Sequence, residues 1–241
     1  MSLKETQKWL SNLGQDYSLE ELEYITHLDL KYKNIKDISP LKELKNLTNL
    51  FLGDNQIKDI SPIKELKNLT NLVLNNNQIK DISPLKELKN LTKLILINNQ
   101  IEDISPLKEI KQITFLDLDS NKIKDISPLK ELTNLTYLYL SNNQIQNISP
   151  LMYLKNITNL HLWRNQIRDI TTLKELNKLI YLDLSSNKIK DISPLKDMIS
   201  IQFLYLDPVI VLEGQYTSFL VRHNIDYKVV PDNPINRELY L

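Results

Sequence analysis

Few residues of this chain could do chemistry. Its 241 residues include three histidines (His27, His161 and His223), which are too far apart in sequence to form a helical metal-binding pair. No cysteine is present, which excludes disulfides, thiolate nucleophiles, iron–sulfur clusters and Cys-ligated zinc. Three glycines, with neither GxGxxG nor GxxxxGK, leave no phosphate-binding loop. We therefore predict no cofactor and no metal.

Carboxylates offer a second kind of chemistry, because one column of aspartates recurs every 22 residues with a single gap. Its members are Asp37, Asp59, Asp81, Asp103, Asp125, Asp169 and Asp191, and Asn147 fills the gap. Stacked carboxylates could bind a metal ion, but they would repel one another, and the residue before each is mostly basic. Aspartate also suits the capping of a turn, so we interpret this column as structural.

The charge balance excludes one class of partner. Lysine and arginine number 30, as do aspartate and glutamate, so the basic excess that nucleic-acid binding needs is missing. No apolar run approaches the roughly 20 residues of a membrane span. The opening MSLKETQKWL also lacks the apolar stretch of a signal peptide. We expect a monomer that is cytoplasmic as written, or trimmed from a secreted or cell-surface protein.

The elements that position these side chains come from a repeat of 22 residues. Two leucines separated by one residue occur nine times, at Leu28/Leu30, Leu50/Leu52, Leu72/Leu74, Leu94/Leu96, Leu116/Leu118, Leu138/Leu140, Leu160/Leu162, Leu182/Leu184 and Leu204/Leu206. An asparagine follows three residues later in seven copies, from Asn55 to Asn187. A buried amide there can donate to a carbonyl of one repeat and accept from an N–H of another.

Each repeat is too short to fold alone and must bury its apolar positions against its neighbours. Segments such as Thr48–Leu52 alternate polar and apolar residues, which predicts short parallel strands in register. Segments such as Ser39–Leu41 predict a helical turn, with serine as the cap and proline at the first helical position. The repeat therefore predicts an α/β fold, a right-handed solenoid.

This pattern resembles the 22-residue leucine-rich repeat, and its Asp-Ile-Ser-Pro-Leu segment is most similar to bacterial internalin-type repeats. The resemblance covers residues 27–206. It implies a leucine-rich-repeat solenoid with a parallel concave sheet of about nine strands, and with 3₁₀ or short helical turns on the convex face. It also implies a protein-binding module.

Residues 1–26 and 207–241 depart from the period, and we expect them to cap the two ends of the repeats. Residues 2–13 predict an amphipathic helix that Gly14 stops, and Ser18–Glu21 has the spacing of a capping box. After residue 207 we expect a helix around Gln215–His223 and an extended Ile225–Val230, which would form an α/β C-terminal cap.

Strand alternation predicts which side chains bind a partner. If the paired leucines point into the core, the residues before, between and after them face the concave side. Eight of the 17 aromatic residues fall in these 27 positions. Tyrosine, tryptophan and arginine carry most of the energy of protein interfaces. We predict a partner-binding face made of Phe51, Ile95, Ile97, Phe115, Asp117, Tyr137, Tyr139, His161, Trp163, Arg164, Tyr181, Asp183, Phe203 and Tyr205.

Other interpretations of this face stay open. The aromatic residues could simply pack across strands, or the face could bind cell-surface carbohydrate, since aromatic rings beside aspartate and asparagine suit sugars. Asp117, Asp119 and Asp183 could act with His161 as a hydrolase, but an open curved sheet has no pocket that excludes water. We predict a non-catalytic module that binds a protein, with glycan binding as the alternative.

Two features lie away from this face. Met152 and Tyr153 replace the usual Lys-Glu of the convex side, which indicates either surface drift or a small apolar contact. The Asn-Leu-Thr segments match the glycosylation pattern, but they follow the period of the repeat, so we interpret them as part of it.

Overall fold

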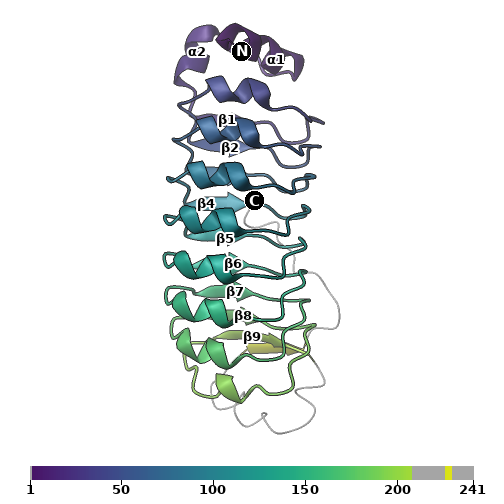
Figure 1. Ribbon diagram of the computed structural model, residues 1–241, viewed down its shortest axis with the longest axis vertical. Helices are drawn as coiled ribbons and strands as arrows, with labels where there is room; N and C mark the ends of the chain where they lie inside the picture. The colour runs from purple at the N-terminus through teal and green to yellow at the C-terminus, as the bar shows by residue number, and fades with distance from the viewer. Residues whose placement is uncertain (1, 208–225, 230–241) are drawn as a thin grey trace.

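The computed structural model describes residues 2–207 and 226–229. Its strands form one parallel sheet in which each strand pairs with the next along the chain (Figure 1). The strands are β1 (His27–Asp29), β2 (Asn49–Phe51), β3 (Asn71–Val73), β4 (Lys93–Ile95), β5 (Phe115–Asp117), β6 (Tyr137–Tyr139), β7 (Asn159–His161), β8 (Tyr181–Asp183), β9 (Phe203–Leu206) and β10 (Asp226–Val229). From β1 to β9, each residue lies opposite the equivalent residue of the next repeat, as Leu50 lies opposite Leu72. The helix expected around Gln215–His223 lies outside the described residues.

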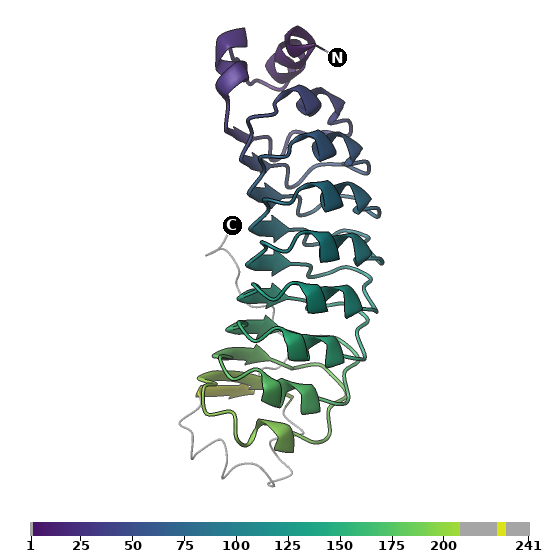
Figure 2. The ribbon, with the colours of Figure 1, turned by 60° about the vertical axis from the view of Figure 1, so that its left-hand side comes forward.

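Between successive strands from β1 to β9 the chain returns through a short 3₁₀ helix. These helices are η1 (Ser39–Glu43), η2 (Ser61–Glu65), η3 (Ser83–Glu87), η4 (Ser105–Glu109), η5 (Ser127–Glu131), η6 (Ser149–Tyr153), η7 (Thr171–Glu175) and η8 (Ser193–Leu195). Figure 2 shows the sheet along the concave side and the 3₁₀ helices along the convex side. The predicted α/β solenoid is confirmed.

The core lies between the sheet and the 3₁₀ helices. In the second repeat it contains the paired Leu50 and Leu52, followed by Ile57, Ile60 and Ile63, and each of these is at most 1% exposed. Full burial of one such side chain contributes about 1.5–3 kcal/mol, and the same positions recur in the neighbouring repeats. The repeats therefore stabilise one another through a continuous apolar column.

The predicted asparagine ladder runs along the edge of this core. Asn77 donates from Nδ2 to the carbonyls of Leu52 (3.0 Å) and Leu74 (3.1 Å), which belong to successive repeats. Its Oδ1 accepts the backbone N–H of Ile57 at 2.9 Å. The side chain is 8% exposed, so it satisfies backbone groups that water cannot reach.

The aspartate column organises the start of each 3₁₀ helix. Asp37 accepts the backbone N–H of Ser39 at 2.8 Å and its hydroxyl at 3.0 Å. The same pair of bonds recurs in other repeats, for example between Asp81 and Ser83. The prediction that serine caps the turn is wrong, because Ser39 is the first residue of η1 and its side chain makes no cap hydrogen bond. The preceding aspartate takes that structural role.

The Asn-Leu-Thr segments form two further ladders on the outside of the sheet. Asn68 donates from Nδ2 to the carbonyl of Lys45 at 3.0 Å, and Thr70 donates from Oγ1 to the carbonyl of Thr48 at 3.2 Å. Both acceptors belong to the preceding repeat. These bonds give a structural reason for asparagine and threonine at these positions.

Two helices cover the first repeat, α1 (Leu3–Asn12) and α2 (Leu19–Tyr24). Each begins with a capping box, formed by Ser2 with Glu5 and by Ser18 with Glu21. Gly14 follows α1 with a φ of 72°, a conformation that glycine adopts without strain. Thr6 anchors α1 to η1 by donating to the carbonyl of Pro40 at 2.9 Å.

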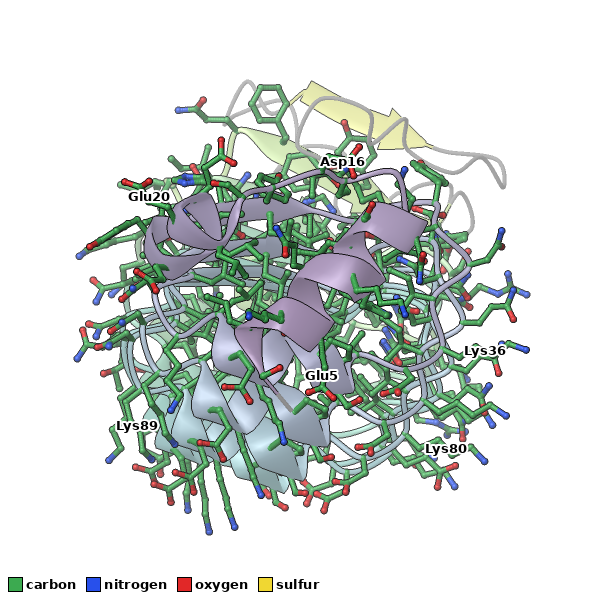
Figure 3. All side chains as sticks on the ribbon, turned by 90° about the horizontal axis from the view of Figure 1, so that it is seen from above. Glu5, Asp16, Glu20, Lys36, Lys80 and Lys89 are labelled. Atoms are coloured by element: carbon green, nitrogen blue, oxygen red, sulfur yellow. The ribbon has the colours of Figure 1, made fainter. Side chains whose placement is uncertain are left out.

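Charged side chains cover the outside of the stack. Seen along the solenoid, Lys36, Lys80 and Lys89 point away from the core (Figure 3). Four lysine–glutamate pairs connect successive repeats on the convex side, at 2.9–3.8 Å: Lys67–Glu87, Lys89–Glu109, Lys111–Glu131 and Lys155–Glu175. Such exposed pairs contribute little each, about 0.2–1 kcal/mol.

Candidate functional site

Three columns of side chains run across the concave face, one before, one between and one after the paired leucines. We call them the first, middle and third concave columns. Val73, Ile95 and Tyr139 of the middle column are buried, yet none belongs to the core cluster that contains their leucine neighbours. The middle column therefore lies on the side of the sheet opposite the core, as alternation predicts.

Seven rings of the first and middle columns contact one another from β5 to β9. We call them the aromatic ladder: Phe115, Tyr137, Tyr139, His161, Tyr181, Phe203 and Tyr205. His161 is stacked between two tyrosines, with ring centroids 4.3 Å from Tyr139 and 4.4 Å from Tyr181. Tilted contacts of 5.2–6.2 Å join the remaining rings to this stack. Such ring pairs contribute about 0.5–1.5 kcal/mol beyond the area they bury.

The accessible part of the concave face is smaller than the sequence predicts. Five of the predicted residues are buried: Ile95, Asp117, Tyr139, His161 and Asp183. The expectation that they point to solvent is wrong, because strands about 4.8 Å apart on an inward-curving sheet bring neighbouring side chains into contact. The partly or fully exposed members are Phe51, Ile97, Phe115, Tyr137, Trp163, Arg164, Tyr181, Phe203 and Tyr205.

Cations lie over aromatic rings at three places on this face. The Lys93 ammonium is 5.0 Å from the centroid of the Phe115 ring, and the Arg164 guanidinium is 5.8 Å from that of Trp163. Near the N-terminal end, Lys31 lies 5.7 Å from Phe51. Arg164 also has a φ of 54°, at a position where the neighbouring repeats carry asparagine or serine. A long side chain is uncommon in this left-handed region.

Two buried titratable groups meet in the middle column. His161 lies opposite Asp183 in the pairing of β7 with β8. Burial lowers the pKa of His161 from 6.5 to about 3, and its Nδ1 has no hydrogen-bond partner among the described residues. Burial raises the pKa of Asp183, although two hydrogen bonds from Ser185 oppose the shift. In each case burial disfavours the charged form.

Comparison with known families agrees with this geometry. Models described as leucine rich repeats in two copies match residues 25–65, 45–87, 67–109, 89–131, 111–151 and 133–175, and a further leucine rich repeat model matches residues 155–207. The chain belongs to the leucine-rich repeat family. Proteins of this family commonly act in protein recognition, and the fold is typical of non-catalytic modules. A search of the curated proteins found no match to this sequence.

Solved structures show the kind of leucine-rich repeat. Internalin C2 of Listeria monocytogenes is 34% identical with a TM-score of 0.78, over 83% of this chain and 91% of that chain. A leucine-rich repeat protein of Leptospira interrogans is 27% identical with a TM-score of 0.79, over 88% of this chain and 57% of that chain. The ectodomain of the Arabidopsis thaliana receptor kinase GASSHO1/SCHENGEN3 is 26% identical with a TM-score of 0.65, over 71% of this chain and 22% of that chain. The repeats are of the internalin type.

The concave aspartates of this leucine-rich repeat protein are bound to its own backbone. Asp117 accepts the N–H of Asp119 at 3.1 Å, and Asp119 accepts the N–H of Ser141 at 2.6 Å. Asp117 lies two strands away from His161, so the four residues of the hydrolase interpretation do not meet at one point. Within residues 2–207 and 226–229 no three metal-ligating side chains form a group that could hold an ion. These carboxylates hold the ends of strands in place.

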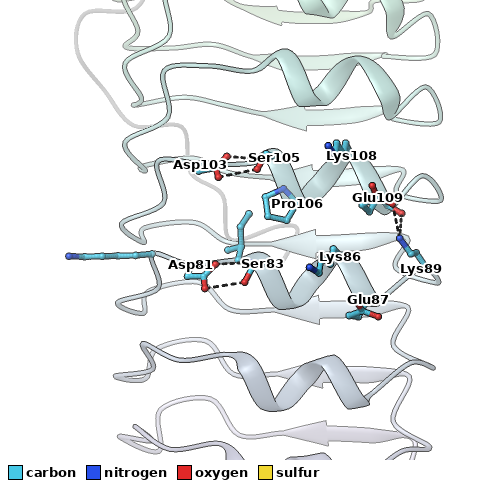
Figure 4. Close-up of a pocket in the computed structure, with 12 residues that line it drawn as sticks. Asp81, Ser83, Lys86, Glu87, Lys89, Asp103, Ser105, Pro106, Lys108 and Glu109 are labelled. Carbon is cyan, nitrogen blue, oxygen red and sulfur yellow. Dashed lines mark hydrogen bonds and ion pairs between the residues drawn. The ribbon is translucent and has the colours of Figure 1, made fainter.

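Hollows between repeats lie on the convex side of this leucine-rich repeat protein. One has a volume of about 670 Å³ and lies between η3 and η4, with charged residues around it (Figure 4). Asp81 and Asp103 bond the serines of their own turns, and Lys89 pairs with Glu109 at 3.0 Å. The carboxylates of this hollow and Lys89 are engaged in contacts that recur along the repeats.

The sequence alone did not reveal one coupled change on the convex side. Tyr153 stands where other repeats place the glutamate of the inter-repeat ion pair, and Thr133 stands where they place its lysine. Both members of one pair are therefore replaced together. Tyr153 is 53% exposed and Met152 is 38% exposed. The spacing of 20 residues between the lysine and the glutamate of each ion pair shows the gap, but only when both repeats are aligned.

No helix in the described part of the chain is both long and apolar enough to cross a bilayer.

Proposed function

We propose that this protein is a non-catalytic recognition module that binds a protein partner through the concave face of β5 to β9. The observation that carries the proposal is the aromatic ladder, in which buried rings support exposed ones. Tyr139 and His161 are 8% and 6% exposed, whereas Tyr137 and Phe203 are 38% and 40% exposed. Exposed rings that pack against buried rings are already restricted before binding, so they lose little conformational entropy when a partner binds, which favours affinity.

The residue types at this surface support a protein partner. Tyrosine, tryptophan and arginine are the residues most often found at the energetic centre of protein interfaces, where each contributes about 2 kcal/mol or more. Trp163 and Arg164 are adjacent, and the guanidinium lies over the indole.

The relatives support the same class of partner. The receptor kinase ectodomain of Arabidopsis thaliana was solved in complex with CASPARIAN STRIP INTEGRITY FACTOR 2. Carbohydrate binding is less well supported, because a sugar needs an open ring face. Both faces of His161 are covered, and the ring of Trp163 has Arg164 beside it.

Partner selection followed by footprinting tests the proposal. Proteins selected from a displayed library with the wild-type protein are mapped by hydrogen exchange and measured with purified components. We expect protection over β5 to β9, and at least about 100-fold weaker binding by the variant Tyr137→Ala/Trp163→Ala/Phe203→Ala, because each exposed anchor is worth about 1–2 kcal/mol.

The matched control removes exposed side chains from the opposite face. Met152→Ala/Tyr153→Ala truncates a methionine and a tyrosine on the convex side, at 38% and 53% exposure, and should leave binding unchanged. Equal loss in both variants, or protection on the convex side, would refute concave recognition. Binding on a glycan array that needs Trp163, with no protein selected, would favour the carbohydrate alternative.

A further inference from the structure

The carboxylate of Asp183 lies on the concave side of the sheet, where no cation of the described residues pairs with it. Asp183 is 3% exposed, and its Oδ1 accepts hydrogen bonds from the backbone N–H of Ser185, at 3.0 Å, and from the Ser185 hydroxyl. No ion pair within the described residues includes Asp183, and Asp207 adds a second negative charge nearby. Buried carboxylates are normally paired, because moving a charge out of water without a partner costs free energy.

Aromatic rings surround this carboxylate. The register places His161 of β7 and Tyr205 of β9 on either side of Asp183, and Tyr181 precedes it on β8. The Tyr181 ring contacts both neighbours, with centroids 4.4 Å from His161 and 5.2 Å from Tyr205. Burial raises the pKa of Tyr181, and the charges of Tyr205 and Asp183 raise it further. We call these four residues the Asp183 subsite.

His161 provides a second, independent observation. It is 6% exposed, and its Nδ1 has no hydrogen-bond partner in the part of the chain that the structure describes. A neutral imidazole does not repel a cation, and in one tautomer its Nδ1 accepts an N–H. A buried acceptor without a partner is expected to find one in a ligand or an ordered water.

We propose that the Asp183 subsite binds a cationic side chain of the protein partner, the ammonium of lysine or the guanidinium of arginine. The carboxylate supplies the opposite charge, and the unpartnered Nδ1 of His161 can accept an N–H of the cation. The nearby Arg164 does not fill this role, because its guanidinium lies over Trp163 and it makes no ion pair with Asp183. This inference rests on the proposed protein recognition by the concave face.

Small amides test the chemistry without an identified partner. N-acetyl-lysine methylamide and N-acetyl-arginine methylamide are titrated into the full chain, and the ring signals of Tyr181, Tyr205 and His161 are followed by NMR. N-acetyl-norleucine methylamide is the uncharged probe of matched length. We expect saturable shifts with Kd on the order of 1–10 mM for the two cations, and no saturable shift for norleucine.

Asp183→Asn is the decisive variant, because an asparagine Oδ1 accepts the same two bonds from Ser185. It should bind the cations at least about 10-fold more weakly, as one lost charge-assisted contact of about 1.4 kcal/mol or more predicts. The matched control is Asp29→Asn in the same column, where the carboxylate is exposed, accepts the N–H of Lys31 at 3.0 Å and pairs with its ammonium at 3.8 Å. The control should bind like the wild type.

Three results would overturn the subsite. These are equal shifts with norleucine, unchanged cation binding by Asp183→Asn, and no saturable shift at about 50 mM of either cation. A protein partner whose binding depends on Trp163 but not on Asp183 would refute this inference and leave the proposed function standing. Cation binding that depends on Asp183, in a protein whose concave face binds no protein, would support the subsite and refute the protein partner.

Discussion

Acid should destabilise this protein through one buried histidine. Burial between Tyr139 and Tyr181 lowers the pKa of His161 from 6.5 to about 3, so the folded protein keeps its imidazole neutral where the unfolded chain protonates. Between these two values the unfolded state binds more protons, and stability falls as the pH falls through 6.5. A pH of 5 is about 1.5 units below the pKa of the imidazole in the unfolded chain, so the free energy of unfolding falls by about 2 kcal/mol relative to pH 7.

His161→Phe isolates this effect. Phenylalanine keeps a ring between the two tyrosines, cannot titrate, and removes the unpartnered Nδ1. Every other titratable group is present in both proteins, so the comparison isolates position 161. We expect the free energy of unfolding to fall by about 2 kcal/mol more in the wild type than in His161→Phe when the pH drops from 7 to 5.

Urea unfolding at constant ionic strength measures this difference, with near-ultraviolet circular dichroism as the signal and equal m-values as the requirement for comparison. An NMR titration of the His161 ring gives the folded pKa directly. The reasoning fails if His161 titrates near 6.5, or if both proteins lose the same free energy between the two pH values.

Three further predictions follow from the ladders and the charges. Asn77→Ala should lower the free energy of unfolding in urea by about 3 kcal/mol, because it leaves buried backbone groups of two repeats unpaired. Asn68→Ala on the outer ladder should lower it by about 1 kcal/mol, and equal losses would contradict this account. Asp183→Asn should be more stable than the wild type at pH 7, because burial raises the pKa of Asp183 and the wild-type protein therefore loses stability as the pH rises through the pKa of the folded state. The advantage of the variant should vanish below pH 3.8, and an advantage that does not change with pH would rule out titration as its cause. Thr133→Lys/Tyr153→Glu restores the missing convex ion pair and should raise the free energy of unfolding by less than about 1 kcal/mol, with the gain lost at about 1 M salt.

The fold could be predicted from the sequence because its signals repeat. The paired leucines, the Asn77 column and the Ser-Pro turns each recur at one spacing, so errors in single residues do not change the result. The serine cap was assigned wrongly because serine and aspartate both suit a turn, and only the geometry shows that Asp37 accepts the bonds from Ser39. The capping box of Ser18 and Glu21 at the start of α2 was likewise predicted, since capping depends on local spacing.

The candidate site could be predicted in position but not in exposure. Alternation shows that Tyr139 and His161 face the concave side, yet it carries no information on what covers them. Their burial depends on rings of the first column in neighbouring strands, here Phe115 and Tyr181, which lie diagonally across the register. The same rule acts at Gly53, where the missing side chain leaves the space that Asn75 occupies. Exposure on this face is therefore a property of adjacent repeats together.

This dependence explains why the concave columns can vary while the rest of the repeat stays constant. The asparagine and aspartate columns bond backbone atoms, so a change at Asn77 disturbs the preceding repeat and a change at Asp81 disturbs the turn of its own repeat. The concave aromatic side chains contact mainly one another, so a change in one of them acts on its neighbours on the same face. The result is a rigid scaffold with one surface whose shape and charge are set by clusters such as the aromatic ladder. A partner that recognises this surface would read several repeats at once, which is why single substitutions among its exposed rings should weaken binding less than the triple variant does.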